Sequence, residues 1–232
     1  MAMPNNRQFL EKIPLFADLG SIELQILGSL LKQREYRKDA IILKQDEPGE
    51  ALFMIVKGRV KVVLYGEKGR EIILSTLKER DFFGEMALLD GSPRSASVIA
   101  QVPSKILVLE RRDFIEQTIK KPQIALKVLE EMSKRLREAD EKIGTLALLD
   151  VYGRLARMLI HLAKQEGKKT EEGMLIEKRP THHEIAATIG TSRETVSRAL
   201  GDFSRRGMIQ TTGKQILIFS RALMEMQDES SS

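Results

Sequence analysis

The chain contains no cysteine. This absence excludes disulfides, thiolate metal sites, iron–sulfur clusters held by the chain and a cysteine nucleophile. It is compatible with a reducing compartment, and we expect a cytoplasmic protein.

Long hydrophobic runs are also missing. No apolar stretch approaches the ~18 residues that a membrane span needs, so no membrane partner is expected. Residues Met1–Glu11 lack the apolar core and small-residue cleavage site of a secretory signal.

The excess of positive charge is small, at +5, with a pI near 9.3. It favours an anionic partner without deciding for one. The 232 residues are 42% hydrophobic and 31% charged, a normal balance for a folded protein. This length predicts two modest domains or one large one.

Short segments rich in β-branched residues alternate with turn signals between residues 35 and 110. They predict strands at Ile41–Leu43, Leu52–Val56, Val60–Leu64, Ile72–Leu74, Ser97–Ala100 and Ile106–Leu109. Strands of this length and spacing predict an antiparallel β-roll. Ser21–Leu31 is expected to form a short amphipathic helix beside it.

A heptad pattern follows the strands. Apolar residues recur at alternating steps of four and three at Ala125, Leu129, Met132, Leu136, Ala139, Ile143 and Leu146. The pattern suits either a helix packed on its own roll or a two-stranded coiled coil. The narrow seam with charges on both flanks favours the coiled coil, and therefore a homodimer.

The last third of the chain reads as a small α/β module. A helix at Val151–Ala163 and a polar loop at Gly167–Gly173 precede two short helices and two strands, Met208–Thr211 and Gln215–Phe219. The fold class is therefore α+β. We expect a jelly-roll-like domain at 1–112, a long dimerisation helix and hinge at 113–149, and a winged helix-turn-helix at 150–232.

One segment inside the predicted roll, residues 82–96, has the chemistry of an anion site. Gly84 allows close backbone approach, and the next residues are long enough for one helical turn with free N–H groups. Arg94 offers a planar fork suited to phosphate, and Ser95 adds a hydroxyl. Glu85 is out of place beside an anion unless it accepts from a sugar hydroxyl. A cyclic mononucleotide presents both groups.

This segment closely resembles the phosphate-binding cassette of cyclic-nucleotide-binding domains. The resemblance implies that backbone N–H groups at Gly84, Met86 and Ala87 bind phosphate together with Arg94 and Ser95. It assigns the ribose 2′-hydroxyl to Glu85.

A second motif lies between Pro180 and Phe203. Thr181 with Glu184 forms a capping box that starts a helix, and Gly190 ends it. Thr191 with Glu194 predicts a second capping box directly after it. Two short helices joined by such a turn form a helix-turn-helix. Four polar residues then point outward near the start of the second helix: Arg193, Glu194, Ser197 and Arg198.

Residues 192–198 are similar to the recognition helix of the cAMP receptor protein (CRP/FNR) superfamily. The resemblance assigns base contacts to Arg193, Glu194 and Arg198, and implies TGTGA-like half-sites in double-stranded DNA. Phosphate contacts are expected at Thr181, His182, Ser192 and Thr195. The strands after Gly207 turn at Thr212–Lys214 and resemble the wing. Residues 178–221 carry eight basic and three acidic side chains, which supports phosphate contact.

The sequence specifies the base of the nucleotide less clearly than the phosphate and the ribose. The resemblance of residues 141–154 to the superfamily fixes a register in which its adenine-reading Thr-Ser pair becomes Ala139-Asp140. Asp140 could accept from the adenine amino group, or from the two donors of guanine, or be a solvated flank residue. We expect cAMP as the effector, with cGMP as the alternative.

Other members of the superfamily offer competing interpretations. Its oxygen sensors need cysteines, which are absent, and its carbon monoxide sensor binds haem through a histidine of the effector domain. The histidines here, His161, His182 and His183, all follow the long helix. His182-His183-Glu184 is not the zinc-binding HExxH motif, so no metal site and no enzyme is expected. Two alternatives stay open. The protein is a nucleotide-binding regulatory subunit that does not bind DNA, or it is a regulator of the same fold with an effector other than a cyclic mononucleotide. RNA polymerase is the protein partner that the resemblance implies.

Overall fold

The computed structural model describes residues 6–66 and 70–223. The contacts within the chain divide it into two compact units, and the boundary in the sequence lies between Leu136 and Arg137. The first unit carries α1 (Asn6–Leu10), a 3-10 turn η1 (Pro14–Phe16), α2 (Ser21–Leu30), β1 (Lys32–Tyr36), β2 (Ile41–Leu43), β3 (Ala51–Lys57), β4 (Arg59–Tyr65), β5 (Glu71–Lys78), β6 (Phe82–Phe83), α3 (Glu85–Asp90), β7 (Ser97–Ala100), β8 (Ser104–Glu110) and α4 (Arg111–Lys120). The long helix α5 (Gln123–Leu148) continues across the division. The second unit carries α6 (Val151–Glu166), β9 (Lys168–Lys169), β10 (Gly173–Ile176), α7 (His182–Ile189), α8 (Arg193–Arg205), β11 (Ile209–Thr212) and β12 (Gln215–Phe219).

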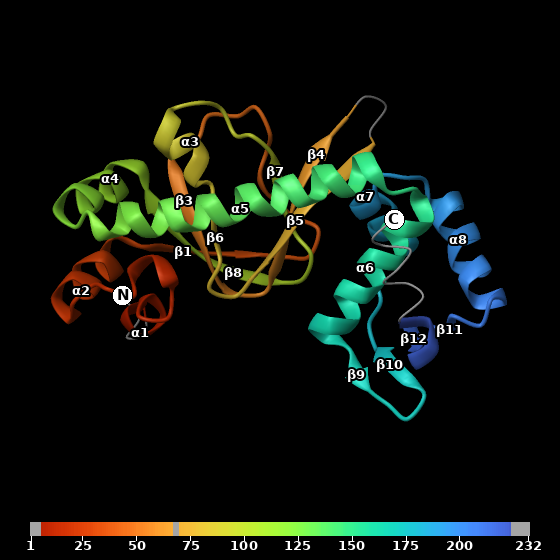
Figure 1. Cartoon of the computed structure of the whole chain (residues 1–232). Coiled ribbons are helices and arrows are strands. Elements are labelled where there is room, and N and C mark those ends of the chain that lie inside the picture. The colour runs from red at the N-terminus through yellow and green to blue at the C-terminus, as the bar shows by residue number, and fades with distance from the viewer. Residues whose placement is uncertain (1–5, 67–69, 224–232) are drawn as a thin grey trace. The chain divides into compact units, whose positions relative to one another are not determined.

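Two four-stranded antiparallel sheets form a roll in the first unit (Figure 1). Their strand orders are β1-β8-β3-β6 and β2-β7-β4-β5. The roll interior is filled by apolar side chains from both sheets: Phe53, Ile55, Val60, Leu77, Phe83, Val98, Ile106 and Val108. The predicted N-terminal β-roll is therefore confirmed.

All six predicted strands are present, and strands β1 and β6 were not predicted. β1 reads Lys-Gln-Arg-Glu-Tyr and is largely exposed, so it shows no hydrophobic alternation. It pairs only with β8 among the described strands, which makes it a sheet edge, where charged side chains discourage association with other chains. β6 has two residues and is too short for a pattern to reveal it.

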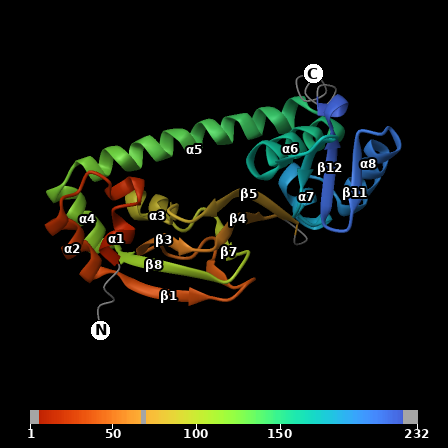
Figure 2. The same ribbon diagram turned by 90° about the horizontal axis from the view of Figure 1, so that it is seen from below.

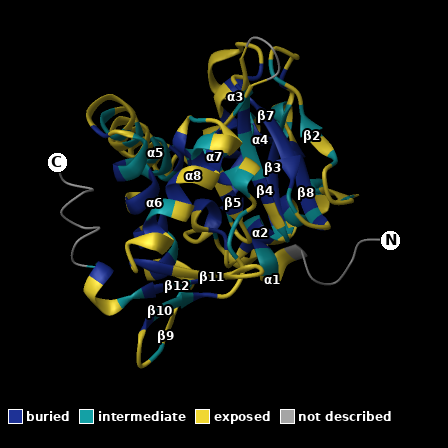
Figure 3. Cartoon of the chain, turned by 90° about the vertical axis from the view of Figure 1, so that its right-hand side faces the viewer, coloured by how far each residue is buried: buried dark blue, intermediate teal, exposed yellow. Residues whose placement is uncertain are grey.

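A second apolar cluster covers the outer face of β3 and β8. It joins the N-terminal helices to α4 and the start of α5 through Leu27, Phe114 and Val128. Figure 2 shows α1, α2 and α4 gathered near the start of α5. β3 lies between the two clusters, which explains its run of four buried residues (Figure 3). No helix in the described part of the chain is long and apolar enough to cross a membrane.

The second unit has a core of its own, built around α6, α7 and α8. Phe203 of α8 is fully buried there, and burial of a side chain of this size contributes about 1.5–3 kcal/mol. The sheet has the order β11-β12-β10-β9. The interpretation of residues 167–173 as a polar loop was wrong, because β9 and the start of β10 pair in this region. Lys168 and Lys169 gave no strand signal, since both are exposed.

The helix that carries the heptad is confirmed as α5. Three of its apolar residues remain largely exposed in the single chain: Leu129 at 60%, Leu136 at 64% and Ile143 at 64%. They stand seven residues apart and so form one stripe along the helix. A stripe of this kind is normally covered by another apolar surface.

Candidate nucleotide-binding and DNA-binding sites

Within the cassette (residues 82–96), Gly84 directly follows β6. Gly84 has a φ of +83°, and it precedes the predicted helical turn, which is present as α3. A Cβ atom at Gly84 would lie 2.8 Å from Nη1 of Arg94 and 3.1 Å from the carbonyl oxygen of Ala51. Only glycine therefore fits this conformation and this close approach.

Arg94 is the central side chain of the cassette. It is 5% exposed, and its Nη1 and Nη2 donate to the carbonyl oxygens of Gly84 and Ala51, at 2.7 and 3.0 Å. The guanidinium lies over the ring of Phe53, 5.6 Å from its centroid. The Nε atom is buried and has no hydrogen-bond partner among the described residues.

The charge of Arg94 is only partly compensated. Burial lowers the pKa of Arg94, while the negative charges of Glu85 and Glu50 oppose this shift. Arginine nevertheless stays protonated in proteins, so the folded chain holds a buried cation whose main acceptors are neutral carbonyl groups. An anion at this position would stabilise the guanidinium.

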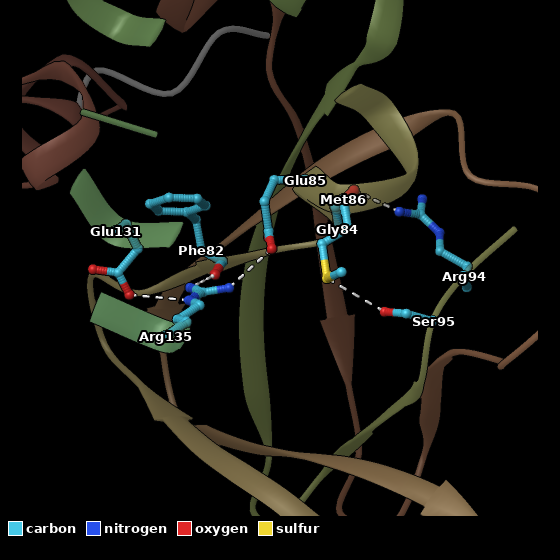
Figure 4. A network of polar contacts seen from close by, with 8 residues as sticks. All are labelled: Phe82, Gly84, Glu85, Met86, Arg94, Ser95, Glu131 and Arg135. Atoms are coloured by element: carbon cyan, nitrogen blue, oxygen red, sulfur yellow. Dashed lines mark hydrogen bonds and ion pairs between the residues drawn. The ribbon is translucent and has the colours of Figure 1, made fainter. Parts of the chain in front are cut away.

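Glu85 connects the cassette to the long helix. This carboxylate is 3% exposed, and its Oε1 accepts from Nη1 of Arg135 at 3.1 Å (Figure 4). Arg135 also donates to the carbonyl oxygen of Phe82 at 2.6 Å and to Glu131 at 3.0 Å. The other oxygen of Glu85, Oε2, is buried without a partner in the described residues.

Arg135 was not predicted as a site residue. In the sequence it is one of several charged residues beside the heptad seam, and nothing distinguishes it from Lys134 or Arg137. Its role depends on a long-range contact with Glu85, which local pattern cannot reveal. A basic residue on α5 facing a buried carboxylate is apparent only once the helix is packed on the roll.

The other predicted cassette residues also lie together. Ser95 Oγ donates to the sulfur of Met86 at 3.5 Å (Figure 4). Ala87 is buried on α3. Asp140 is exposed on α5 and falls in the second compact unit, whereas the cassette belongs to the first.

The predicted helix-turn-helix is present as α7 and α8. Thr181 Oγ1 accepts from the backbone N–H of Glu184, whose side chain accepts from the Thr181 backbone, so the first capping box is confirmed. Gly190 ends α7 with a φ of +68°. The second capping box was wrong by one residue, because Ser192 caps α8 and accepts from the N–H of Thr195 at 3.2 Å.

Three of the residues predicted to contact phosphate take part in hydrogen bonds at the helix caps. The hydroxyl of Thr181 donates to Glu184 Oε2 at 2.9 Å. The hydroxyls of Ser192 and Thr195 lie 3.1 Å apart, and that of Thr195 accepts from Arg198 Nη2 at 3.4 Å. A phosphate oxygen would therefore compete with local hydrogen bonds at these hydroxyls.

The start of α8 presents charged side chains to solvent. Arg193, Glu194 and Arg198 are exposed, while Val196 and Phe203 are buried on the opposite face. The backbone N–H of Glu194 lowers the pKa of that carboxyl, and the Ser192 hydroxyl adds to the effect. Glu194 is therefore an ionised acceptor at neutral pH, as contact with a cytosine amino group requires.

Two further predicted residues flank this helix pair. Lys214 is exposed in the turn between β11 and β12, and its carbonyl accepts from the N–H of Arg179 at 2.9 Å. This bond ties the β-turn to the segment that leads into α7. His182 is partly buried at the start of α7, and burial, followed by the charge of Arg179, lowers its pKa. His182 is therefore neutral at pH 7.

Comparison with known proteins gives consistent matches over most of the chain. Residues 33–120 match the cyclic nucleotide-binding domain, and residues 153–228 match the Crp-like helix-turn-helix domain. The cAMP-activated global transcriptional regulator CRP of Salmonella typhimurium is 37% identical over 187 residues, which cover 80% of this chain and 88% of that protein. The chain belongs to the CRP/FNR family.

Two further comparisons extend the match. The cyclic AMP receptor protein of Thermus thermophilus is 34% identical, over 91% of this chain and 95% of its own. The c-di-GMP-responsive global regulator CLP of Xanthomonas campestris has the same fold, with a TM-score of 0.77 at 22% identity, over 87% of this chain and all of that one. The chain is thus a CRP-like DNA-binding transcription regulator with a cyclic nucleotide-binding domain. The expectation that it is not an enzyme is confirmed by its relatives, which are transcription regulators.

Proposed function

We propose that the protein is a homodimeric transcription regulator whose affinity for DNA is controlled by a cyclic nucleotide, with cAMP as the effector. The observation that carries the proposal is the pair of unpartnered buried atoms in the cassette, Arg94 Nε and Glu85 Oε2. Buried polar atoms normally have hydrogen-bond partners, and each exception calls for an explanation. A phosphate oxygen would serve the guanidinium, and a ribose hydroxyl would serve the carboxylate.

The nucleotide would be held by this chain's cassette residues in distinct ways. Arg94 and Ser95 would bind the phosphate together with the backbone N–H groups at Gly84, Met86 and Ala87. Glu85 would accept from the 2′-hydroxyl while Arg135 keeps it oriented. Because Arg135 stands on α5, ligand binding at Glu85 would act directly on that helix.

The exposed stripe on α5 supports the homodimer. A second copy of the same helix would cover Leu129, Leu136 and Ile143, and the charged flanks suit a two-stranded coiled coil. We further propose the division into an effector domain at 1–112, a dimerisation helix and hinge at 113–149, and a DNA-binding domain at 150–232. Dimerisation would place two recognition helices in successive major grooves about 34 Å apart.

The proposed DNA contacts are those of a CRP-type recognition helix on TGTGA-like half-sites. Arg193, Glu194 and Arg198 would read bases, since arginine suits guanine and glutamate suits the cytosine amino group. Phosphates would be contacted by a second set: Thr181, His182, Ser192, Thr195 and Lys214. RNA polymerase is the proposed protein partner, and the cytoplasm the proposed location, as we expect for a transcription regulator of this family.

The effector is tested by calorimetric titration of the nucleotide-stripped, full-length protein with cAMP and, in parallel, cGMP. We expect micromolar binding of cAMP and weak binding of cGMP. The variant Asp140→Ala should keep this order, with Glu141→Ala as the matched acidic control on the same helix.

Two other outcomes would change the proposal. A preference for cGMP that Asp140→Ala abolishes would make Asp140 the base reader and cGMP the effector. Binding of neither nucleotide would contradict the effector half of the proposal. Another ligand would then have to fill the cassette, and the same fold is found in a c-di-GMP-responsive regulator.

A further inference from the structure

The junction between α5 and α6 is fastened by polar contacts within the second unit. Asp150 caps α6 by accepting from the N–H of Gly153 at 2.8 Å. Arg154 Nη1 donates to the carbonyl oxygens of Leu149 and Leu146, at 2.9 and 3.3 Å. The end of α5 and the start of α6 are therefore held together.

The start of α6 is also joined to α8, through Tyr152. Its hydroxyl donates to Oδ2 of Asp202 at 2.5 Å. Its ring meets the buried ring of Phe203 edge-on, with centroids 6.0 Å apart. Oδ1 of Asp202 forms an ion pair with Arg205 on the same helix. This hydrogen bond raises the pKa of Tyr152 and lowers that of Asp202, so the donor stays protonated and the acceptor stays ionised at neutral pH.

The two contacts of Tyr152 constrain α8 differently. An edge-on ring contact is apolar and tolerates small rotations of the helix, because dispersion forces have little directional preference. A short hydrogen bond to a carboxylate is directional and fixes one point of α8 relative to α6. Asp202 lies in the C-terminal half of α8, whereas the exposed polar residues lie in its first turns. Movement at Asp202 would therefore tilt the end that faces DNA.

We propose that Tyr152 is a positioning residue for α8, whose hydrogen bond to Asp202 fixes the angle at which the helix enters the major groove. The inference rests on the proposed assignment of α8 as the recognition helix. Base reading needs side chains held in a narrow geometry, whereas phosphate contact depends mainly on charge. Loss of the bond should therefore reduce sequence discrimination more than binding itself.

The test compares Tyr152→Phe with the wild-type full-length protein. Affinity is measured at saturating cAMP for an operator duplex obtained by in vitro selection and for a random duplex of equal length. We expect the variant to lose about tenfold in operator affinity, the size of one hydrogen bond to a charged group, and to keep its affinity for the random duplex. Calorimetric affinity for cAMP should not change.

Variants of Asp202 supply the controls. Asp202→Asn keeps an oxygen acceptor for the tyrosine hydroxyl and should retain more discrimination than Asp202→Ala. Combining Tyr152→Phe with Asp202→Ala should be no worse than Asp202→Ala alone, because both changes remove one interaction. Additive losses in the double variant would contradict the inference, as would equal losses on both duplexes or a change in thermal stability alone.

Amide hydrogen exchange separates this inference from the proposed function. If the wild-type protein fails to distinguish the two duplexes, the proposed function is wrong. Amide hydrogen exchange then still tests whether the hydrogen bond between Tyr152 and Asp202 holds α8 in place. Tyr152→Phe should then speed exchange across α8 several-fold, and unchanged exchange would overturn the inference.

Discussion

Replacement of Arg94 by alanine is expected to reduce the affinity for cAMP by about 100-fold. The guanidinium would lose charge-assisted hydrogen bonds to the phosphate, each contributing about 1.5–3 kcal/mol, and tenfold in affinity corresponds to about 1.4 kcal/mol. Arg94→Lys should fall between alanine and the wild type, since lysine keeps the charge but lacks the planar fork. Isothermal titration calorimetry measures all three affinities directly.

Arg94 also has a structural role, so the comparison needs a matched control. Arg111 offers one, because its Nε donates to the carbonyl oxygen of Leu88 on α3 at 3.1 Å. Arg111→Ala removes an arginine–carbonyl bond to α3, next to the cassette turn, without removing a partner of Gly84 or Glu85. We expect it to leave nucleotide affinity nearly unchanged. Wild-type affinity in Arg94→Ala, or equal losses in both variants, would remove Arg94 from the phosphate site.

The second large effect is expected from replacing Arg193 or Lys214 by alanine. The two variants should lose affinity for DNA in different ways. Arg193→Ala should cost about 1–3 kcal/mol on the operator and relax the preference at one position of each half-site, because a base contact is lost. Lys214→Ala should weaken binding to all sequences alike and reduce the salt slope by about 1, because one phosphate contact is lost.

Each of these variants is the control for the other. Both residues are exposed cations of the second unit, one on α8 and one in the β11–β12 turn. Fluorescence anisotropy on operator and random duplexes at several salt concentrations distinguishes the two behaviours. Equal losses on operator and random DNA for Arg193→Ala would remove it from the base-reading set. Sequence-dependent losses for Lys214→Ala would make that residue a reader.

The sequence predicted the parts of the molecule whose signals are local. Composition predicts the strands at Val60–Leu64 and Ser97–Ala100, and the spacing of apolar residues alone predicts the helix α5. Gly84 and Arg94 could be singled out because their chemistry is unusual within one short segment. Gly190 marked the end of α7 because a left-handed turn there requires it.

What the sequence did not reveal depends on contacts between distant segments. β1 is a strand only because β8 pairs with it, and its own residues are those of a solvated loop. Arg135 contacts the cassette through Glu85, and Tyr152 contacts Asp202, which lies 50 residues further along the chain. The cap of α8 fell on Ser192 rather than Thr191, an error of one residue typical of element boundaries.

The central claim is that the nucleotide and the DNA are coupled through one protein. The direct measurement is the affinity of the full-length protein for a duplex with two TGTGA-like half-sites, with and without saturating cAMP. We predict that cAMP raises this affinity by a factor within about 5–150, and that the duplex raises the affinity for cAMP by the same factor. Equal DNA affinity with and without cAMP, at concentrations where calorimetry shows the nucleotide bound, would contradict it.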